Sequence, residues 1–211
     1  MDYLLHFFDL LRHFNLAQLL QEYGSLLYVV FFVIIFVETG VVVLPFLPGD
    51  SLLFVAGALA AFPNGLSLAV LIPLLVLAAF LGDNLNYFIG DRLGPRVFRE
   101  DFRFLKRKYL VQTQEFYARH GGKTLILARF VPIVRTFAPF VAGLGTMSYR
   151  RFASYCIVGA VLWVVSMSMA GYLFGAIPFV QKNFELVVIG VVVLSLLPAL
   201  WQALRRKKVM G

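Results

Sequence analysis

Long apolar stretches, separated by shorter polar ones, make up most of the chain. A helix needs about 20 mainly apolar residues to cross a bilayer. Four stretches reach that length and are predicted to be membrane-spanning helices: residues 25–44, 66–90, 152–177 and 184–204. Residues 1–22 carry scattered Leu and Phe side chains among charged ones, and they are predicted to form an amphipathic helix on the membrane surface.

Two further apolar stretches do not fit a simple crossing helix. Residues 51–62 number only 12, which is too short to cross. Residues 124–147 are long enough, but charges and helix breakers interrupt them. The interrupting residues are Arg129, Pro132, Arg135 and Pro139. Because proline removes a backbone donor and kinks or breaks a helix, this stretch is not predicted to be a regular span.

The positions of the basic residues indicate the sidedness of the chain. Nine of the 19 lysines and arginines fall within residues 92–123, and four form the tail 205–208. Such clusters are typical of cytoplasmic segments. Two predicted spans connect Arg151 to the tail, which places Arg151 on the cytoplasmic side together with Lys123. A segment with both ends on one side does not cross, so residues 124–147 are predicted to be a re-entrant hairpin. The alternative is one kinked helix.

A weak internal repeat relates the two halves of the chain. Residues 54–57 read Phe-Val-Ala-Gly and recur at 140–143, and residues 87–90 recur loosely at 172–175, with offsets of 86 and 85 positions. Each copy is an interrupted hairpin followed by a span. The span 66–90 ends on the cytoplasmic side, so it begins outside. The first hairpin, which precedes it, is therefore predicted to enter from outside, and the second, which follows the cytoplasmic segment, from inside. This predicts an inverted-topology repeat, an architecture of many secondary transporters.

These patterns predict an all-α integral membrane protein with one membrane domain, residues 1–211, and a cytoplasmic C-terminus. Its predicted parts are the amphipathic helix 1–22, a first repeat 25–90 with a re-entrant hairpin at about 38–62, a basic amphipathic cytoplasmic segment 91–123, a second repeat 124–204 with its hairpin at 124–147, and a basic tail 205–211.

Composition agrees with this class and narrows the function. The chain is 61% hydrophobic and only 14% charged, which is too apolar for a soluble domain. The net charge of +8 is clustered as in cytoplasmic segments, so nucleic acid is not an expected partner. The single cysteine, Cys156, excludes an intramolecular disulfide and a thiolate metal cluster. Since no metal-ligand spacing and no catalytic motif is present, we expect no metal, no cofactor and no enzyme activity.

Four ionisable residues stand out in the predicted hairpins. Glu38 and Asp50 belong to the first hairpin, and Arg129 and Arg135 belong to the second. Each charge costs about 2.5–3.5 kcal/mol at the bilayer centre, so it must be paired or line a watery cavity. The two acids and the two bases would neutralise each other if the hairpins met. Salt bridges that only hold the hairpins together are the structural alternative.

A transport site would use the same four residues. Arginine presents a planar fork that binds phosphate, so Arg129 and Arg135 are candidate ligands of an anionic headgroup. Apolar surroundings favour the protonated form of a carboxylate, so Glu38 and Asp50 are candidate proton carriers. The N-terminal ends of helices that begin at these breakers would add partial positive charge. The possible cavity-lining residues at these breakers are Pro48, Gly49, Pro132 and Pro139.

Asp83 is a further possible cavity-lining residue, within the span 66–90. Helix packing together with its neighbours Asn84 and Asn86 is the equal alternative for it.

At these residues the chain resembles the DedA family, whose shared region is also called the VTT or SNARE-associated domain. The matching stretches are 38–51, 82–90, 120–123 and 129–143. The resemblance implies a bacterial inner-membrane protein with two re-entrant hairpins whose acidic and basic residues are needed for function. Some members are implicated in returning undecaprenyl phosphate across the membrane, and related eukaryotic proteins scramble phospholipids.

Residue chemistry and resemblance together predict a proton-coupled transporter or flippase of a lipid phosphate, either undecaprenyl phosphate or a phospholipid. The expected partners are membrane lipids, this anionic substrate and protons, and a homo-oligomer is possible. One alternative is a proton-coupled transporter of small ions or cationic compounds, in which the acids bind the substrate and the arginines are counter-ions. The non-transport alternative is a structural membrane protein that recruits partners through the basic segment 92–123.

Overall fold

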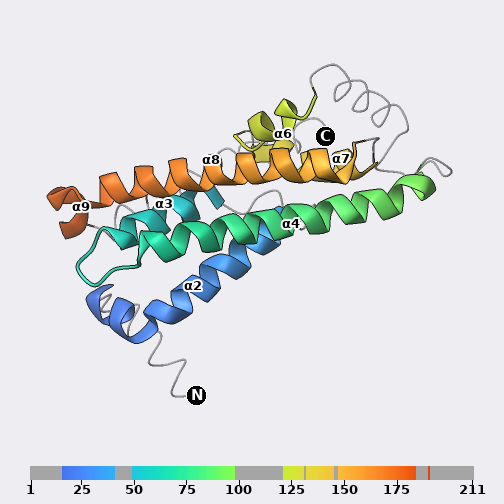
Figure 1. The fold of residues 1–211 in the computed structure, drawn as a ribbon. Coiled ribbons are helices and arrows are strands. Elements are labelled where there is room, and N and C mark those ends of the chain that lie inside the picture. The colour runs from blue at the N-terminus through green and yellow to red at the C-terminus, as the bar shows by residue number, and fades with distance from the viewer. Residues whose placement is uncertain are drawn as a thin grey trace, which may run out of the picture. The chain divides into compact units, whose positions relative to one another are not determined.

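The computed structural model describes residues 16–40, 49–97, 121–130, 132–144, 147–183 and 190. Every regular element within these ranges is a helix (Figure 1). The helices are α2 (Leu16–Gly40), α3 (Gly49–Ala60), α4 (Leu68–Val97), α6 (Lys123–Ala128), α7 (Pro132–Leu144), α8 (Tyr149–Gly175) and α9 (Pro178–Lys182). The all-α prediction is therefore confirmed for the described part of the chain.

Three of these helices are long and apolar enough to cross a membrane. The candidate spans are Tyr23–Gly40 in α2, Leu68–Arg92 in α4 and Tyr149–Gly175 in α8. They correspond to three of the four spans predicted from the sequence. The fourth, residues 184–204, lies outside the described residues except for residue 190, and so do most of residues 1–22, most of the basic segment and the tail.

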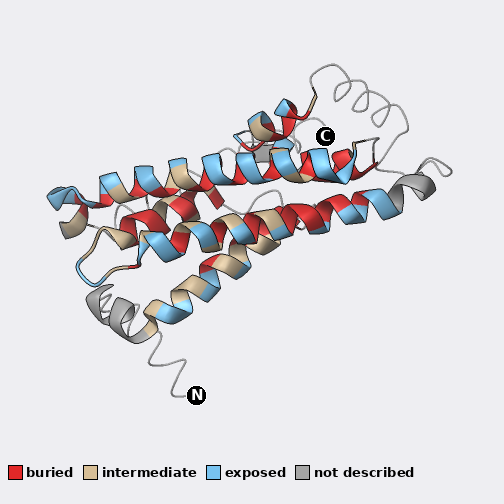
Figure 2. Ribbon diagram, in the orientation of Figure 1, coloured by how far each residue is buried: buried red, intermediate tan, exposed pale blue. Residues whose placement is uncertain are grey.

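The surfaces of the three spans have the character of lipid-facing helices. Only 28%, 39% and 33% of the three windows is buried within the chain. Exposed positions recur along α4 and α8, as Figure 2 shows. Large apolar side chains among them include Leu26, Val29, Val33, Val70, Leu77, Leu162 and Leu173. A soluble protein rarely leaves so much contiguous apolar surface uncovered, so the bilayer is the expected solvent.

Two helix boundaries differ from those expected from hydropathy. α4 continues to Val97, seven residues beyond the predicted end of its span at residue 90, and α2 already begins at Leu16 within the predicted surface helix. A change in polarity marks where a helix leaves the apolar layer, but backbone hydrogen bonding continues until a breaker or a cap intervenes. Hydropathy therefore locates the crossing and not the helix end.

The stretch 124–147 forms two helices instead of one kinked helix. α6 has six residues and ends at Ala128, a turn follows at Arg129 and Phe130, and α7 begins at Pro132. Proline suits the first helical position because its missing N–H would have no intrahelical partner there. Neither helix is long enough to cross a bilayer alone. A re-entrant course in a membrane stays a prediction.

The chain divides into two compact units. The first comprises Met1–Phe31, Pro48–Ile72 and Met167–Gly211. Within it, α3 packs backbone to backbone against the C-terminal part of α8. A Cβ atom added at Gly57 would lie 2.0 Å from the carbonyl oxygen of Ser168, and one added at Gly171 would lie 1.9 Å from that of Phe54. Only glycine permits this approach, which is typical of membrane helices that pack through small residues.

The second unit comprises Phe32–Leu47 and Pro73–Ser166. Within it, α7 packs against α4 in the same manner. A Cβ added at Gly143 would lie 2.0 Å from the carbonyl oxygen of Tyr87, and one added at Gly90 would lie 2.1 Å from that of Phe140.

These glycine contacts involve both copies of the Phe-Val-Ala-Gly sequence. In each unit, the short helix that carries this sequence in one copy packs on the long helix of the other copy. The repeat thus coincides with equivalent backbone contacts. The opposite orientation of its copies in a membrane stays a prediction.

Candidate functional site

A buried ion pair between Arg129 and Asp83 forms the centre of the candidate site, within the second unit. Asp83 lies on α4, and Arg129 is the C-cap residue that directly follows α6. They are only 4% and 5% exposed, respectively. The break between α6 and α7 therefore places a guanidinium against the middle of a membrane-spanning helix. The partner expected for this arginine was an acid of the first hairpin, and the acid found here belongs to α4 instead.

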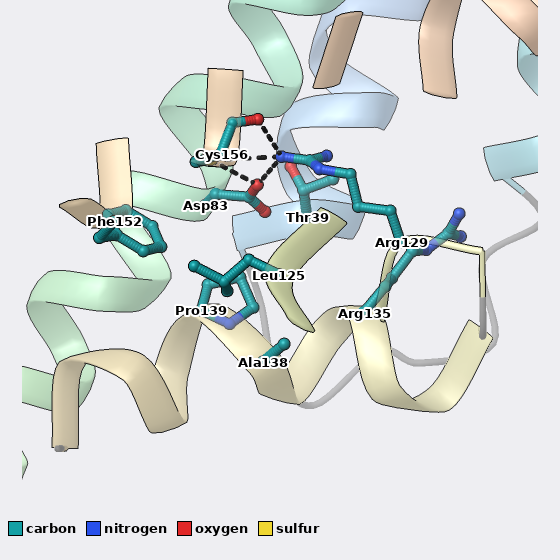
Figure 3. A pocket seen from close by; sticks show the side chains of 9 residues that line it. All are labelled: Thr39, Asp83, Leu125, Arg129, Arg135, Ala138, Pro139, Phe152 and Cys156. Atoms are coloured by element: carbon teal, nitrogen blue, oxygen red, sulfur yellow. Dashed lines mark hydrogen bonds and ion pairs between the residues drawn. The ribbon is translucent and has the colours of Figure 1, made fainter. Parts of the chain in front are cut away.

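Cys156 on α8 completes this cluster. Nη2 of Arg129 donates to the backbone carbonyl of Cys156 and to its sulfur, each at 3.2 Å. The thiol donates to Oδ2 of Asp83 at 3.0 Å (Figure 3). Gly159, about one turn further along α8, makes room for the arginine. A Cβ atom there would lie 2.8 Å from Nε of Arg129.

A second buried ion pair joins Arg135 on α7 to Glu38 in the last turn of α2. Arg135 is 8% exposed and Glu38 is 1% exposed. The guanidinium carbon of Arg135 also lies 4.7 Å from the ring centroid of Trp163 on α8. A cation over the face of an indole ring is stabilised by the ring quadrupole, and more strongly when water is excluded. This pair brings together one acid and one base of the four expected from the sequence; Glu38 lies on the candidate span α2, and the meeting of two re-entrant hairpins stays a prediction.

The two arginines line one pocket. Its other lining residues are Thr39, Asp83, Leu125, Ala138, Pro139, Phe152 and Cys156. Figure 3 shows these side chains, which come from α2, α4, α7, α8 and the end of α6; Arg129, Asp83 and Cys156 meet there, and the guanidinium of Arg135 points away from them. The formal charges of the two ion pairs cancel, and of their two carboxylates only that of Asp83 is among the lining residues.

A close approach of α2 and α4 fixes the positions of the two acids. A Cβ atom at Gly82 would lie 1.9 Å from Oγ1 of Thr39, so only glycine allows this contact. Nδ2 of Asn86 donates to the backbone carbonyl of Thr39 at 3.4 Å. Gly82 and Thr39 are the sequence neighbours of Asp83 and Glu38, so this contact positions both acids.

The three polar residues in this part of α4 have different environments. Nδ2 of Asn84 donates to the carbonyl of Phe80 at 2.6 Å, and its Oδ1 accepts from the hydroxyl of Tyr149 at 2.8 Å. Asn84 and Asn86 thus connect helices, whereas Asp83 lines the pocket. Asp83 lines the pocket and its contacts also join α4 to Arg129 and to α8, so its position agrees with both interpretations left open for it.

Of the remaining predicted site residues, one lines the pocket and the others lie elsewhere or outside the described part. Asp50 is in the first turn of α3 and belongs to the first unit, directly after the buried Gly49. Pro139 lines the pocket, and Pro132 begins α7. Pro48 lies outside the described residues. The described residues contain no group of three or more His, Cys, Asp or Glu side chains placed to hold a metal ion.

Sequence reasoning missed three contributors to the site. Thr39, Cys156 and Trp163 sit in apolar helices, where a hydroxyl, a thiol or an indole is unremarkable. Only Cys156 has a feature that can be recognised in the sequence. Gly159 lies three residues later on the same face of the helix, so there is space for another side chain beside a group that can form hydrogen bonds. That space has no meaning until the position of Arg129 is known.

Helices that can cross a membrane and buried ion pairs beside a broken helix define the class of the protein, a multi-helix membrane protein. The VTT domain matches residues 47–173. The protein DedA of Escherichia coli is 51% identical over 99% of this chain and 97% of its own length. The uncharacterized membrane protein Rv0364 of Mycobacterium tuberculosis is 46% identical, over 87% of this chain and 81% of its own.

A more distant relative is the inner membrane protein YghB of Salmonella typhimurium, 36% identical over 81% of this chain and 78% of its own length. The chain belongs to the DedA family of VTT-domain membrane proteins. No solved structure matches it.

Proposed function

We propose that the protein transports a lipid phosphate across the membrane and that Arg129 and Arg135 bind the phosphate. The observation that carries the proposal is that both guanidiniums line one pocket beside membrane-spanning helices. Arginine donates several N–H groups in a fixed plane and binds phosphate oxygens in pairs. Two such forks at one pocket suit a phosphate group better than a carbonyl or a hydroxyl.

The surroundings of the arginines favour a lipid over a free ion. α6 and α7, which lead into and out of the break, expose large apolar side chains. These are Leu127, Phe130, Val134 and Phe137, and Leu127 is 69% exposed. An apolar chain attached to the phosphate could lie along this surface in the bilayer while the headgroup occupies the pocket. Undecaprenyl phosphate and phospholipids both have this form.

Protons are the proposed energy source. Glu38 is buried beside Arg135, and a proton taken up there would release the arginine. Asp50, in the first turn of α3, is the second proposed proton carrier. Each net elementary charge that moves down a potential of 100 mV provides about 2.3 kcal/mol. Protons carried together with the phosphate offset its negative charge, and they also move down any difference in pH across the membrane. A bacterial inner membrane with a cytoplasmic C-terminus is the proposed location.

Proteoliposomes test this function directly. Purified protein is reconstituted with undecaprenyl phosphate in one leaflet, and its appearance in the other leaflet is followed over time. We expect at least a tenfold loss of rate for Arg129→Ala/Arg135→Ala, and little change for the control Arg150→Ala/Arg151→Ala, whose arginines are exposed. Equal rates for wild type and the Arg129/Arg135 variant would rule the function out.

A proton-coupled carrier of small ions or cationic compounds is the alternative. It would use the acids as the binding site and the arginines as counter-ions. The described pocket supports it less well, because both guanidiniums line the pocket, whereas only one of the two paired carboxylates, that of Asp83, does. Uptake of a labelled cation by vesicles without lipid phosphate would favour this alternative.

A further inference from the structure

Both arginines of the pocket are already engaged by carboxylates. Arg129 pairs with Asp83 and Arg135 pairs with Glu38, and all four side chains are buried. Phosphate and carboxylate oxygens accept hydrogen bonds from the same N–H groups of a guanidinium. A phosphate can therefore bind both arginines fully only by displacing the carboxylates.

We propose that Asp83 is an internal competitor of the substrate: it occupies Arg129 while the pocket is empty, and it takes up a proton when a phosphate displaces it. Glu38 does the same at Arg135. This inference rests on the proposed function and adds to it a residue, Asp83, and a fixed number of protons. The site then binds phosphate together with protons, as a symporter does.

Charge balance sets the number of protons. With both carboxylates counted as ionised, the two buried ion pairs sum to zero before a phosphate binds. A phosphate monoester is largely a dianion at pH 8, because its second pKa is about 6. Binding it without protons would leave two excess negative charges in a site where burial makes unpaired charge costly. Uptake of two protons, one by Asp83 and one by Glu38, restores neutrality.

The groups around Asp83 allow this exchange. The charged and titratable neighbours that face it are Arg129 at the end of α6, Arg135 on α7 and Cys156 on α8. Arg129 keeps the backbone carbonyl of Cys156 as an acceptor when Asp83 leaves, since Nη2 already donates to it at 3.2 Å. The guanidinium is therefore held in position during the exchange, while its carboxylate partner changes.

Proton uptake on ligand binding tests the competitor role. The full-length protein in detergent is titrated at pH 8 with dodecyl phosphate, a monoester with one apolar chain. Calorimetry in buffers of different ionisation enthalpy then counts the protons. We expect about two protons per phosphate for wild type, with an apparent Kd that rises about a hundredfold per pH unit. Asp83→Asn should take up about one proton, with about a tenfold rise per pH unit.

Asp91→Asn is the matched control, because it makes the same change at an exposed position of the same helix. It should keep the wild-type proton count. The proposal is overturned if Asp83→Asn takes up as many protons as wild type, or if wild type takes up one or none. A wild-type count of one or none overturns the proposal even if the Asp83 variant does not fold, and a count of two is assigned to Asp83 only by the loss of one proton in Asp83→Asn.

Two further results separate this inference from the proposed function. Absence of dodecyl phosphate binding by wild type, or equal binding by Arg129→Ala/Arg135→Ala, would remove the phosphate site itself and the inference with it. Binding that depends on the arginines but takes up fewer than two protons would leave the phosphate site in place and overturn only the competitor role of Asp83. Inorganic phosphate, used as a second ligand, should bind more weakly if the apolar chain contributes.

Discussion

Asp83 and Arg129 form a buried ion pair although 46 positions separate them in the sequence. The pair joins a membrane-spanning helix to the break between two short helices. Its position means that the arginine proposed to bind phosphate is also part of the packing of the second unit. Its substitution should therefore affect stability as well as transport.

Arg129→Ala should lower the free energy of unfolding by about 3–5 kcal/mol, because it leaves the buried carboxylate of Asp83 without its cation. The double variant Asp83→Asn/Arg129→Gln should recover at least half of this loss, since neither side chain then carries a charge. Chemical unfolding in detergent measures both values. Arg150→Ala, at an exposed position, is the control and should change stability little. A double variant no more stable than Arg129→Ala would contradict the pairing.

Gly143→Ala should destabilise the protein by about 1–3 kcal/mol, the usual cost of overpacking. The added Cβ would lie 2.0 Å from the carbonyl oxygen of Tyr87, so α4 and α7 would have to separate. Gly57→Ala should have a similar effect in the first unit. Gly24→Ala is the control, because no atom lies within 4 Å of its Cβ position. Thermal unfolding followed by circular dichroism gives the comparison, and equal midpoints for all three variants would count against close helix packing.

Trp163→Leu should impair lipid-phosphate transport more than Trp163→Phe. Both variants shorten a fully buried side chain, but phenylalanine keeps an aromatic face under the guanidinium of Arg135. A desolvated cation–π contact contributes about 2 kcal/mol, so its loss should release the arginine from its position. Transport rates of the two variants, normalised to folded protein, test this. Equal impairment would indicate that only the volume of the ring matters.

The single thiol, Cys156, reports on the pocket without any engineered label. It is buried and donates to Asp83, so N-ethylmaleimide should modify the wild-type protein slowly. Arg129→Ala removes a side chain that lies against the thiol and should speed modification at least tenfold. Mass spectrometry of the intact protein measures the rate. Fast modification of wild type, at the rate seen after denaturation, would show that the pocket is open at rest.

The sequence predicted the membrane spans because bilayer thickness imposes a length that composition reveals. It also predicted the break in 124–147 at Pro132, which cannot continue a preceding helix without disrupting it. Pro139 was expected to interrupt the same stretch, but it lies inside the continuous helix α7. The partner of Arg129 could not be predicted. On α4, Asp83 and Asn84 point about 100° apart and Asn84 and Asn86 about 200° apart, and only the packing of the neighbouring helices shows which one faces the pocket.

The glycine positions show the same limit. Gly82 and Gly159 leave space for a threonine and an arginine that are distant in the sequence. Nothing in the local sequence distinguishes such a glycine from one with an open environment, such as Gly24. Pairing between distant helices therefore has to come from the structure, whereas span, polarity and breakers can be recognised beforehand.

An experimental structure with dodecyl phosphate bound tests the central claim most directly. The account predicts phosphate density between the guanidiniums of Arg129 and Arg135, with the carboxylates of Asp83 and Glu38 turned away from them. Phosphate density at another place on the protein, with both ion pairs still intact, would contradict it.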